Sequence, residues 1–422
     1  MKRLSAFCAS LIVALVSITA TIAAEPQLQP GDYVAVIGDS ITEQQLYSLY
    51  IEDYLLMCQP ARELRVTQFG WGGETAPGFA NRMANDMLRF GATVATTCFG
   101  MNDGRYAPMT PSTGEAYLKG QKSIVRQLKE AGVRLIVVGS PGCVDADTFS
   151  GHNAERAKMY NETLSAMRDI ARQVAQEEGV VFANVLDPMI DVMTKAKAKY
   201  GRDYHLAGGD GVHPDRNGHL VMAYAFLKAL GCDGNIGSIT VDLTQNQAQA
   251  SDGHKVLSCA SGVIEIESTR YPFCFYGDPA QTGSTRGVLE FLPFNEQLNR
   301  LTLAVTGGTA ARLKVTWGDV SKEYTAAQLA TGINLAAEFL DNPFSEPFRQ
   351  VEGKISQQQA LEVQLVKNLL HDIPTYKQIA PDEADSLEDV ADALVAKDKV
   401  ARDASAAAIT PVKHVIKIEA VQ

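Results

Sequence analysis

The sequence contains four short polar segments whose residue types suit nucleophilic catalysis. The first, G-D-S-I-T at 38–42, follows an apolar run that ends at Ile37 and precedes a helical pattern from Glu43. Because glycine permits a sharp turn there, Ser40 would project both its hydroxyl and its own backbone N–H from the edge of a sheet. We therefore predict Ser40 as a nucleophile. The alternative is that Ser40 or Thr42 only caps the following helix.

Two further segments could donate hydrogen bonds to a negatively charged oxygen. In G-W-G-G-E-T at 70–75, the small residues let the backbone approach a substrate, so the N–H of Gly73 is a candidate donor. In G-M-N-D at 100–103, the amide of Asn102 is a strong uncharged donor. The alternatives are a simple turn for the glycines and an Asx-turn for Asn102. Trp71 could form a pocket wall or pack in the core, and both uses stay open.

The fourth segment, D-G-V-H-P at 210–214, could supply a base and the group that orients it. The carboxylate of Asp210 can hold Nδ1–H of His213 while Nε2 takes a proton from the serine. Pro214 fits the start of the helix that follows. Of the seven histidines, His205 and His219 compete with His213, but neither has a carboxylate so placed and a following proline.

Five apolar runs predict the strands that would position these segments. They lie at 33–37, 64–69, 93–99, 133–138 and 180–185, and stretches with helical spacing separate them. Strict alternation of strands and helices predicts a parallel sheet with helices on both faces, which is a three-layer α/β/α domain. In such domains ligands bind at the carboxyl ends of the strands. The polar segments that follow the strands are therefore expected to meet at one edge.

The pattern changes after Cys232. Short apolar runs with turn residues between them predict strands at 239–243, 263–267, 289–292, 301–305 and 313–317. Beyond about residue 330, apolar residues recur at helical spacing up to a last helix rich in Ala, Asp and Lys. We predict four parts: a signal peptide (1–24), an α/β domain (25–232), a β-rich accessory region (233–330) and a helical C-terminal segment (331–422).

The four ordered segments resemble the conserved blocks of the SGNH hydrolases, the GDSL-type esterase and lipase superfamily. The resemblance covers residues 31–232 and implies a flavodoxin-like sheet of about five parallel strands. It also implies a catalytic triad of Ser40, His213 and Asp210, with an oxyanion hole formed by Ser40, Gly73 and Asn102.

The residue before Gly73 departs from the family pattern, since Gly72 stands where many members carry a serine. We expect this change to affect the shape of the pocket but not the donor N–H of Gly73. The region after 232 lies outside the family pattern, so the resemblance implies nothing about it.

The resemblance implies a serine ester hydrolase that works through an acyl-enzyme. We expect short-chain acyl esters, acetyl esters above all, of small molecules or polysaccharides. One alternative is a lipase or lysophospholipase of the same fold. Another is an inert glycan-binding protein whose aromatic residues Tyr271, Phe273, Phe275 and Trp317 form a ligand platform, although core packing is the commoner use of such residues.

Composition and the N-terminal residues indicate the class of protein, its partners and its cellular location. The chain has 422 residues, 46% of them hydrophobic, and a formal charge of -11, which predicts a globular protein and excludes nucleic acid as a partner. Residues 1–24 begin with Lys2 and Arg3, continue with an apolar stretch, and end in the small residues Ala23 and Ala24. This pattern predicts a signal peptide and a secreted or periplasmic protein, with a retained N-terminal anchor as the alternative. We expect no other membrane span.

Six cysteines follow the predicted signal peptide. Export permits disulfides, and Cys259 and Cys274 could bridge a hairpin, but buried thiols are the alternative. The sequence has no C-x-x-C, and His213 and His219 lie six apart with no zinc-ligand spacing around them. We therefore expect no metal and no cofactor. The oligomeric state does not follow from the sequence.

Overall fold

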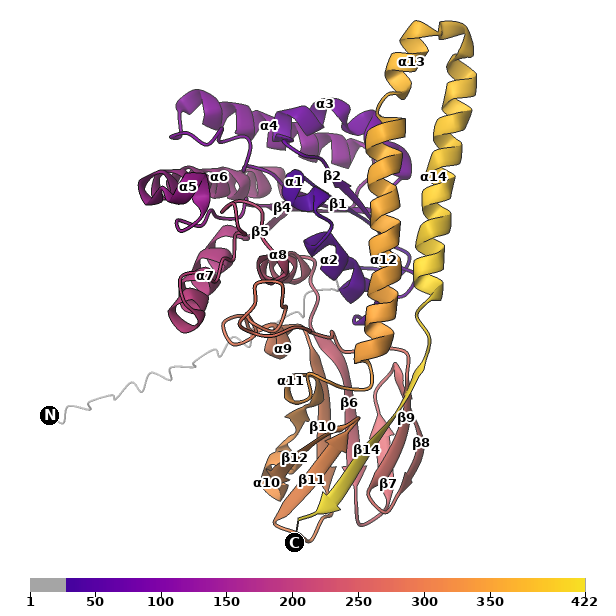
Figure 1. The fold of residues 1–422 in the computed structure, drawn as a ribbon. Helices are drawn as coiled ribbons and strands as arrows, with labels where there is room; N and C mark the ends of the chain where they lie inside the picture. The colour runs from indigo at the N-terminus through magenta and orange to yellow at the C-terminus, as the bar shows by residue number, and fades with distance from the viewer. Residues whose placement is uncertain (1–27, 422) are drawn as a thin grey trace, which may run out of the picture.

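A computed structural model describes residues 28–421 (Figure 1). The predicted signal peptide, residues 1–24, lies outside the described residues, as does Cys8. In the described part of the chain no helix is long and apolar enough to cross a membrane.

The first half of the chain forms a three-layer α/β/α domain, as predicted. Its sheet has five parallel strands in the order β2-β1-β3-β4-β5. The strands are β1 (Tyr33–Gly38), β2 (Arg65–Gly70), β3 (Val94–Cys98), β4 (Leu135–Gly139) and β5 (Val181–Ala183). Each of the five predicted apolar runs is therefore a strand. Successive side chains point to opposite faces, so Val34 and Val36 join one hydrophobic cluster while Ala35 and Ile37 join the other.

Helices cover both faces of this sheet. They are α1 (Ser40–Glu43), α2 (Tyr47–Met57), α3 (Ala76–Asp86), η1 (Leu88–Phe90), α4 (Pro111–Glu130), α5 (Phe149–His152), α6 (Ala154–Glu178), α7 (Leu186–Tyr200) and α8 (Arg216–Ala229). Residues of α2, α7 and α8 such as Leu55, Val192 and Leu227 pack with one cluster. Residues of α3 and α4 such as Phe79 and Ile124 pack with the other. The sheet is thus buried on both sides, as an all-parallel sheet requires.

The second half begins with two further sheets below the α/β domain in Figure 1. One has the strand order β13-β10-β6-β7 and the other β12-β11-β14-β9-β8. The strands are β6 (Asn235–Asp242), β7 (Gln247–Ala250), β8 (His254–Ala260), β9 (Val263–Ser268), β10 (Arg300–Thr306), β11 (Arg312–Trp317), β12 (Val320–Thr325), β13 (Ile333–Asn334) and β14 (Val412–Ala420). Short helices α9 (Phe294–Gln297), α10 (Ala326–Thr331) and α11 (Leu335–Glu338) connect them. A smaller β-rich region therefore follows the α/β domain, while the exact division of the chain at residue 232 stays a prediction.

Two elements of this region differ from the sequence prediction. The expected strand at 289–292 is a turn, in which Leu292 N donates to Val288 O at 2.9 Å and both side chains are buried. A four-residue apolar run fits one helical turn as well as a strand, so its pattern does not distinguish the two. The segment 331–422, expected to be helical, ends in β14, whose alternating buried residues pair with β9 and β11.

The remaining helices form a long hairpin beside the α/β domain, which we call the C-terminal arm (residues 345–407). It consists of α12 (Ser345–Leu365), η2 (Val366–Leu370), α13 (Ile373–Ile379), η3 (Pro381–Glu383) and α14 (Ala384–Ala407). Figure 1 shows α12 and α14 running side by side along one edge of the domain.

The arm covers the free edge of strand β2. Gln68 N donates to Glu362 Oε2 at 2.9 Å, and Gln358 Nε2 donates to Val66 O at 3.3 Å. An uncovered edge strand leaves backbone N–H and C=O groups unpaired and open to other chains. Side chains of α12 therefore take the place of a sixth strand at this edge.

Several carboxyl groups are buried where α2 meets the arm. Burial raises the pKa of Glu52 to about 8, although hydrogen bonds from Gln359 and Gln358 act in the opposite direction. Asp53 is also fully buried, and within residues 28–421 neither of its carboxyl oxygens has a hydrogen-bond partner. Burial, and then the neighbouring Glu352 and Glu52, raise the pKa of Asp53 well above its ordinary value. The folded protein therefore favours a protonated Asp53.

We expect the variant Asp53→Asn to be more stable than the parent protein at pH 8, and the difference to shrink at pH 5. The folded state keeps the Asp53 proton, while the unfolded state releases it above a pKa of about 3.9, so the parent loses stability as the pH rises. Asparagine carries no such proton. Thermal unfolding should be measured for both proteins at the two pH values. At pH 8 the unfolding midpoint of Asp53→Asn should be about 2 °C or more above that of the parent.

The exposed Asp319 provides the matched control, because Asp319→Asn makes the same chemical change in solvent. A pH-independent difference between the Asp53→Asn and parent midpoints would show that Asp53 is ionised in the folded protein.

Candidate active site

The register of the parallel sheet brings three of the four polar segments together. Gly38 at the end of β1 pairs with Gly70 at the end of β2 and with Cys98 at the end of β3. A Cβ atom at Gly38 would lie 2.0 Å from Thr42 Oγ1 and 2.8 Å from Cys98 O. Only glycine therefore lets the first turn of α1 pack back onto the end of β1.

Ser40 is the first residue of helix α1 and does not cap it. The cap is Asp39, whose Oδ1 accepts a hydrogen bond from Ile41 N at 3.0 Å. Thr42 is fully buried and its hydroxyl lies 2.6 Å from that of Tyr47. The alternative that Ser40 or Thr42 caps the helix is therefore wrong. Burial raises the pKa of Asp39 to about 7, partly offset by the hydrogen bond from Ile41.

Ser40, His213 and Asp210 form a continuous chain of hydrogen bonds. Ser40 Oγ lies 2.8 Å from His213 Nε2, and His213 Nδ1 lies 2.7 Å from Asp210 Oδ2. With a proton on Nδ1 donated to Asp210, Nε2 accepts the hydrogen bond of the serine hydroxyl. The arrangement places a base against Ser40 and an orienting carboxylate behind it.

The other oxygen of Asp210 fixes the loop that carries the histidine. Asp210 Oδ1 accepts hydrogen bonds from the backbone N–H groups of Val212 and His213, each at 2.9 Å. Partial burial raises the pKa of Asp210, but these bonds and that of the His213 ring outweigh it and lower the pKa overall. The following helix α8 begins at Arg216, two residues later than the start expected at Pro214, and Asp215 is its cap.

His219, one of the two competing histidines, is a buried core residue. Its Nδ1 accepts a hydrogen bond from Tyr47 N at 3.2 Å, and its Nε2 lies 3.1 Å from Gln44 Oε1. Burial lowers the pKa of His219 to about 3. The ring is therefore neutral, and both its nitrogens are engaged away from Ser40.

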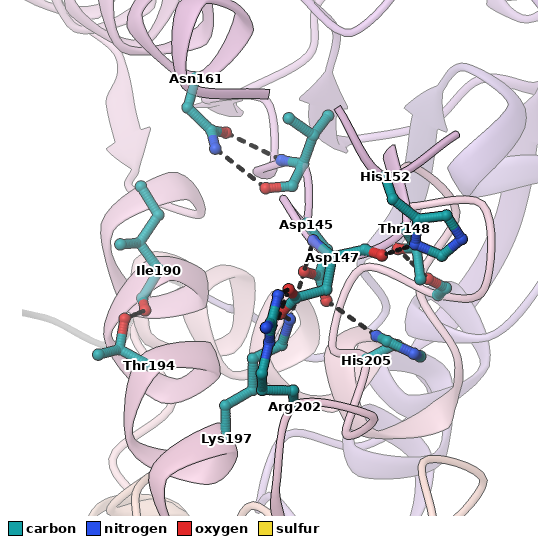
Figure 2. Close-up of polar contacts among 12 residues, drawn as sticks. Asp145, Asp147, Thr148, His152, Asn161, Ile190, Thr194, Lys197, Arg202 and His205 are labelled. Atoms are coloured by element: carbon teal, nitrogen blue, oxygen red, sulfur yellow. Dashed lines mark hydrogen bonds and ion pairs between the residues drawn. The ribbon is translucent and has the colours of Figure 1, made fainter. Parts of the chain in front are cut away.

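His205 has a carboxylate partner that the sequence spacing did not indicate. Its Nδ1 lies 3.3 Å from Oδ2 of Asp145, a residue 60 positions upstream in the loop after β4. Figure 2 shows this pair in a network in which Lys197 contacts Asp145 and Asp147, and Arg202 contacts Asp147. His205 thus belongs to an ion-pair network that lies apart from the contact between Ser40 and His213.

This network supports the loop that carries Asp210 and His213. Asp145 N donates to Gly211 O at 3.0 Å, and Thr148 Oγ1 donates to Gly208 O at 3.1 Å. Asp145 itself is almost fully buried and forms an ion pair with Lys197. Two loops far apart in sequence are thereby held against each other beside the triad.

The two expected oxyanion donors lie on the neighbouring loops. Gly73 is an exposed residue with a φ of +75°, which favours glycine, and within residues 28–421 its N–H has no hydrogen-bond partner. Asn102 donates through Nδ2 to Glu74 O at 3.0 Å, which links the loop after β3 to the loop after β2. An amide nitrogen has two hydrogens, so one remains for another acceptor. The side chain of Asn102 forms this cross-loop bond and not an Asx-turn.

Asp103, which follows Asn102, ties the same two loops together. Its Oδ1 accepts from Ala76 N at 2.9 Å and its Oδ2 from Gly100 N at 3.0 Å. Burial raises the pKa of Asp103 to about 6, and these hydrogen bonds act against the rise. Sequence reasoning assigned Asp103 no role, although its position directly after a predicted donor was a usable signal.

The C-terminal arm holds the loop that contains Gly73. The carboxylate of Glu43 accepts a hydrogen bond from Gly72 N through one oxygen and binds Lys367 Nζ at 2.6 Å through the other. The Trp71 ring lies 4.7 Å from the His371 ring, and Lys367 Nζ lies 5.0 Å from the Trp71 ring centre. Trp71 is therefore half-buried beneath the arm. Nothing in the sequence indicated that Lys367 and His371 would reach this loop.

A cavity of about 290 Å³ opens beside the triad. Its lining residues come from two loops, from α5 and from the first turn of α6, and they are Tyr106, Phe149, Ser150, Arg156, Asp210, Val212 and His213. Within residues 28–421 no cluster of three or more His, Cys, Asp or Glu side chains could hold a metal ion.

The expected aromatic platform in the second half is buried. Tyr271, Phe273, Phe275 and Trp317 are each at most 3% exposed. Phe273 packs against Phe275, with ring centres 5.1 Å apart. Residues 271–275 do not form a strand. The hypothesis that these rings bind a glycan is therefore wrong, because no ring face is open to a ligand.

The cysteines of the described part of the chain are free thiols. Cys259 and Cys274, expected as a possible bridge, are not bonded, and Cys274 is buried. Burial raises the pKa of Cys274 and that of Cys58 above the ordinary range of a thiol. These side chains behave as small hydrophobic residues.

Comparison with known proteins gives one family and a set of similar structures. Residues 36–221 match the GDSL-like Lipase/Acylhydrolase family. No curated protein matches the chain. A gut microbial diltiazem-metabolizing enzyme of known structure covers 93% of this chain and 98% of its own, with a TM-score of 0.71 and 24% identity. This likeness shows a shared fold over both halves of the chain.

Smaller proteins match only part of the chain. An acetylxylan esterase from Geobacillus stearothermophilus covers 49% of this chain and 96% of its own, at 20% identity and a TM-score of 0.40. An alpha/beta hydrolase enzyme from the metagenome of Lake Arreo, Spain, covers 49% of this chain and 98% of its own, at 22% identity and a TM-score of 0.37.

We expect Lys367→Met to loosen the loop at 70–75. Removal of the ammonium group leaves Glu43 without its cation and weakens its hold on Gly72 N–H, a loss of about 1 kcal/mol or less for a partly exposed pair. Hydrogen exchange of a peptide that covers this loop should accelerate by about threefold. Lys367→Arg, which keeps the charge, should exchange at nearly the parent rate.

The control is Lys399→Met, which removes an exposed lysine paired with Asp403 elsewhere on the same arm. If the Lys367→Met and Lys399→Met proteins exchange this loop at equal rates, the arm does not hold it.

Proposed function

We propose that the protein is a carboxylic ester hydrolase that acts through Ser40, His213 and Asp210, because residues 36–221 match the GDSL-like Lipase/Acylhydrolase family. The single observation that carries the proposal is the pair of contacts at 2.8 Å and 2.7 Å that joins these three side chains. They come from segments about 170 residues apart, so their meeting reflects the fold and not local sequence.

In the first half of the reaction, His213 Nε2 takes the proton of Ser40 as its oxygen attacks the ester carbonyl. Asp210 holds the ring through Nδ1 and stabilises the imidazolium that forms. The same imidazolium then gives its proton to the leaving alcohol as the carbon–oxygen bond breaks. The products of this half are the free alcohol and an acyl group on Ser40.

In the second half, water takes the place of the alcohol. His213 accepts a proton from the water, whose oxygen attacks the acyl carbon. The tetrahedral intermediate collapses, the bond to Ser40 breaks, and the proton returns to the serine oxygen. The carboxylic acid leaves and Ser40 is regenerated.

Backbone and side-chain donors stabilise the negative oxygen of each tetrahedral intermediate. We assign this role to the N–H groups of Ser40 and Gly73 and to the amide of Asn102. Among the described residues the N–H of Gly73 has no partner, which supports the assignment, since such a group gains most when an oxyanion arrives. The bond from Asn102 to Glu74 O supports it too, because it fixes the amide before substrate binds.

The substrates we propose are short-chain acyl esters, acetyl esters above all, of polar alcohols such as carbohydrates. The cavity beside His213 has a volume of about 290 Å³ and includes charged and hydroxyl side chains. A lipase would be expected to offer apolar surface around its site. Within the described residues, none of the exposed large hydrophobic side chains lines this cavity. A polar alcohol is therefore favoured over a lipid.

We expect Ser40→Ala to lower kcat for a chromogenic acetate ester by about 10⁴-fold or more, because the variant has no nucleophile. Asn102→Ala, which removes one oxyanion donor, should lower kcat by about 10²- to 10³-fold. Esters with acyl chains of two to twelve carbons should show a decline in kcat/KM with length. A serine-directed phosphonate should label the parent protein but not Ser40→Ala.

Near-parent turnover by Ser40→Ala would overturn the assignment of the nucleophile. A rise of kcat/KM with chain length would instead favour the lipase alternative. Circular dichroism of each variant checks that it has folded.

We also propose that the protein is exported, with residues 1–24 as the signal peptide. Expression of the full chain should yield a secreted or periplasmic protein whose N-terminus, read by mass spectrometry, is Glu25. Recovery of the intact N-terminus in the membrane fraction would favour a retained anchor.

A further inference from the structure

The proposed mechanism decides on which side of the site the alcohol part of the substrate lies. His213 must give its proton to the leaving oxygen, so this oxygen comes within hydrogen-bond distance of Nε2. The alcohol therefore extends past the His213 ring. The cavity of about 290 Å³ is lined by His213 and Asp210, so it adjoins the ring past which the alcohol extends.

Two of the residues that line this cavity have strained backbone conformations. Tyr106 has a φ of 53° and Ser150 a φ of 51°, a region that bulky residues rarely adopt. Tyr106 is held there by its ring, which stacks on Tyr160 at 4.9 Å between centres. Such conformations concentrate at functional sites, where the surrounding structure maintains them.

Arg156 brings a positive charge to the same cavity. Its Nη1 donates a hydrogen bond to Ser150 Oγ at 2.9 Å, which orients the guanidinium group. Within residues 28–421 no acidic side chain forms an ion pair with Arg156. Asp210, the carboxylate of the cavity, is already occupied by three hydrogen bonds from Val212 and His213.

The position of Arg156 in its helix is also unfavourable for a structural role. It lies in the first turn of α6, whose cap is Asn153. The helix dipole favours acidic side chains at this end and disfavours basic ones. Arg156 is oriented, has no acid partner in the part of the chain that the structure describes, and lies at the end of the helix that disfavours a cation. Binding of an anion from outside the chain explains all three features.

We propose that Arg156 forms the subsite for an anionic group on the alcohol part of the ester, so that the preferred substrates are acyl esters of acidic sugars such as hexuronic acids. The inference rests on the proposed function and adds the substrate class to it. The planar guanidinium presents paired N–H groups that match the two oxygens of a carboxylate. Tyr106 provides a ring against which the apolar face of a sugar can pack.

Three acetylated sugars that differ only at C6 test the subsite. They are a monoacetylated methyl galactosiduronic acid, its primary amide, and the corresponding galactoside with sulfate at C6. The acid and the amide have the same shape, so only charge separates them. We expect a kcat/KM about tenfold higher for the acid than for the amide, and a smaller ratio in high salt. If kcat/KM for the C6-sulfated galactoside equals that for the acid, the subsite accepts any anion. If it equals that for the amide, the subsite accepts carboxylates only.

Arg156→Gln should lower kcat/KM for the acid by about tenfold, to the level of the amide, because it removes the charge. Arg156→Lys should keep part of the preference, since it keeps the charge but loses the paired geometry. The matched control is Arg172→Gln, which changes a partly exposed arginine further along the same helix α6 and should retain the parent preference.

Binding provides a readout that does not need turnover. In the Ser40→Ala background, titration calorimetry should show tighter binding of the acid than of the amide, and Arg156→Gln should abolish the difference. Equal kcat/KM for acid and amide in the parent protein would overturn the subsite, as would equal losses on both substrates in Arg156→Gln. Either result leaves the ester hydrolase intact. If Ser40→Ala still hydrolyses the esters, the triad fails, but a preference that depends on Arg156 would still establish the subsite.

Discussion

The register of the parallel sheet is the constraint on which the site depends. Because β1 lies between β2 and β3 with Gly38 opposite Gly70 and Cys98, the loops that follow all three strands emerge at one edge. Gly73 and Asn102 lie on these loops, and Ser40 is the first residue of helix α1, which follows β1. A shift of one strand by a residue would move its loop along the edge and turn its buried side chains to the opposite face. The hydrophobic clusters on both faces therefore fix the geometry of the site as well as the stability of the domain.

Side chains from segments that are distant in sequence hold the loops of the site against one another. Asp103 and Asn102 bind the loops after β2 and β3 to each other. On the opposite side, the loop that contains Asp145 holds the loop that presents Asp210 and His213. The loops that carry the candidate site residues are thus held by contacts from both groups of segments. Such bracing keeps reacting groups within hydrogen-bond distance before any substrate arrives, which is where much of catalytic efficiency originates.

The second half of the chain makes specific contacts with the first. Glu362 and Gln358 satisfy the backbone of edge strand β2, and Lys367 reaches the carboxylate that holds Gly72. After the arm, the chain returns to the β-rich region, where β14 lies between β9 and β11. The arm is therefore attached at both ends to the β-rich region and along its length to the α/β domain. This integration agrees with the fold that the chain shares over 93% of its length with a known structure.

The sequence by itself determined the α/β domain and the residues of the candidate triad, because period-2 and period-3.6 apolar patterns and the segments after each strand are local signals. It missed β14, although Val412, His414, Ile416 and Ile418 alternate with exposed residues, and it mistook the turn at 289–292 for a strand. Only the tertiary structure decided which distant residues meet. Three features depend on how elements pack in space: the pairing of His205 with Asp145, the contact of Lys367 with Glu43, and the burial of Tyr271, Phe273 and Phe275. Spacing along the sequence does not indicate this packing.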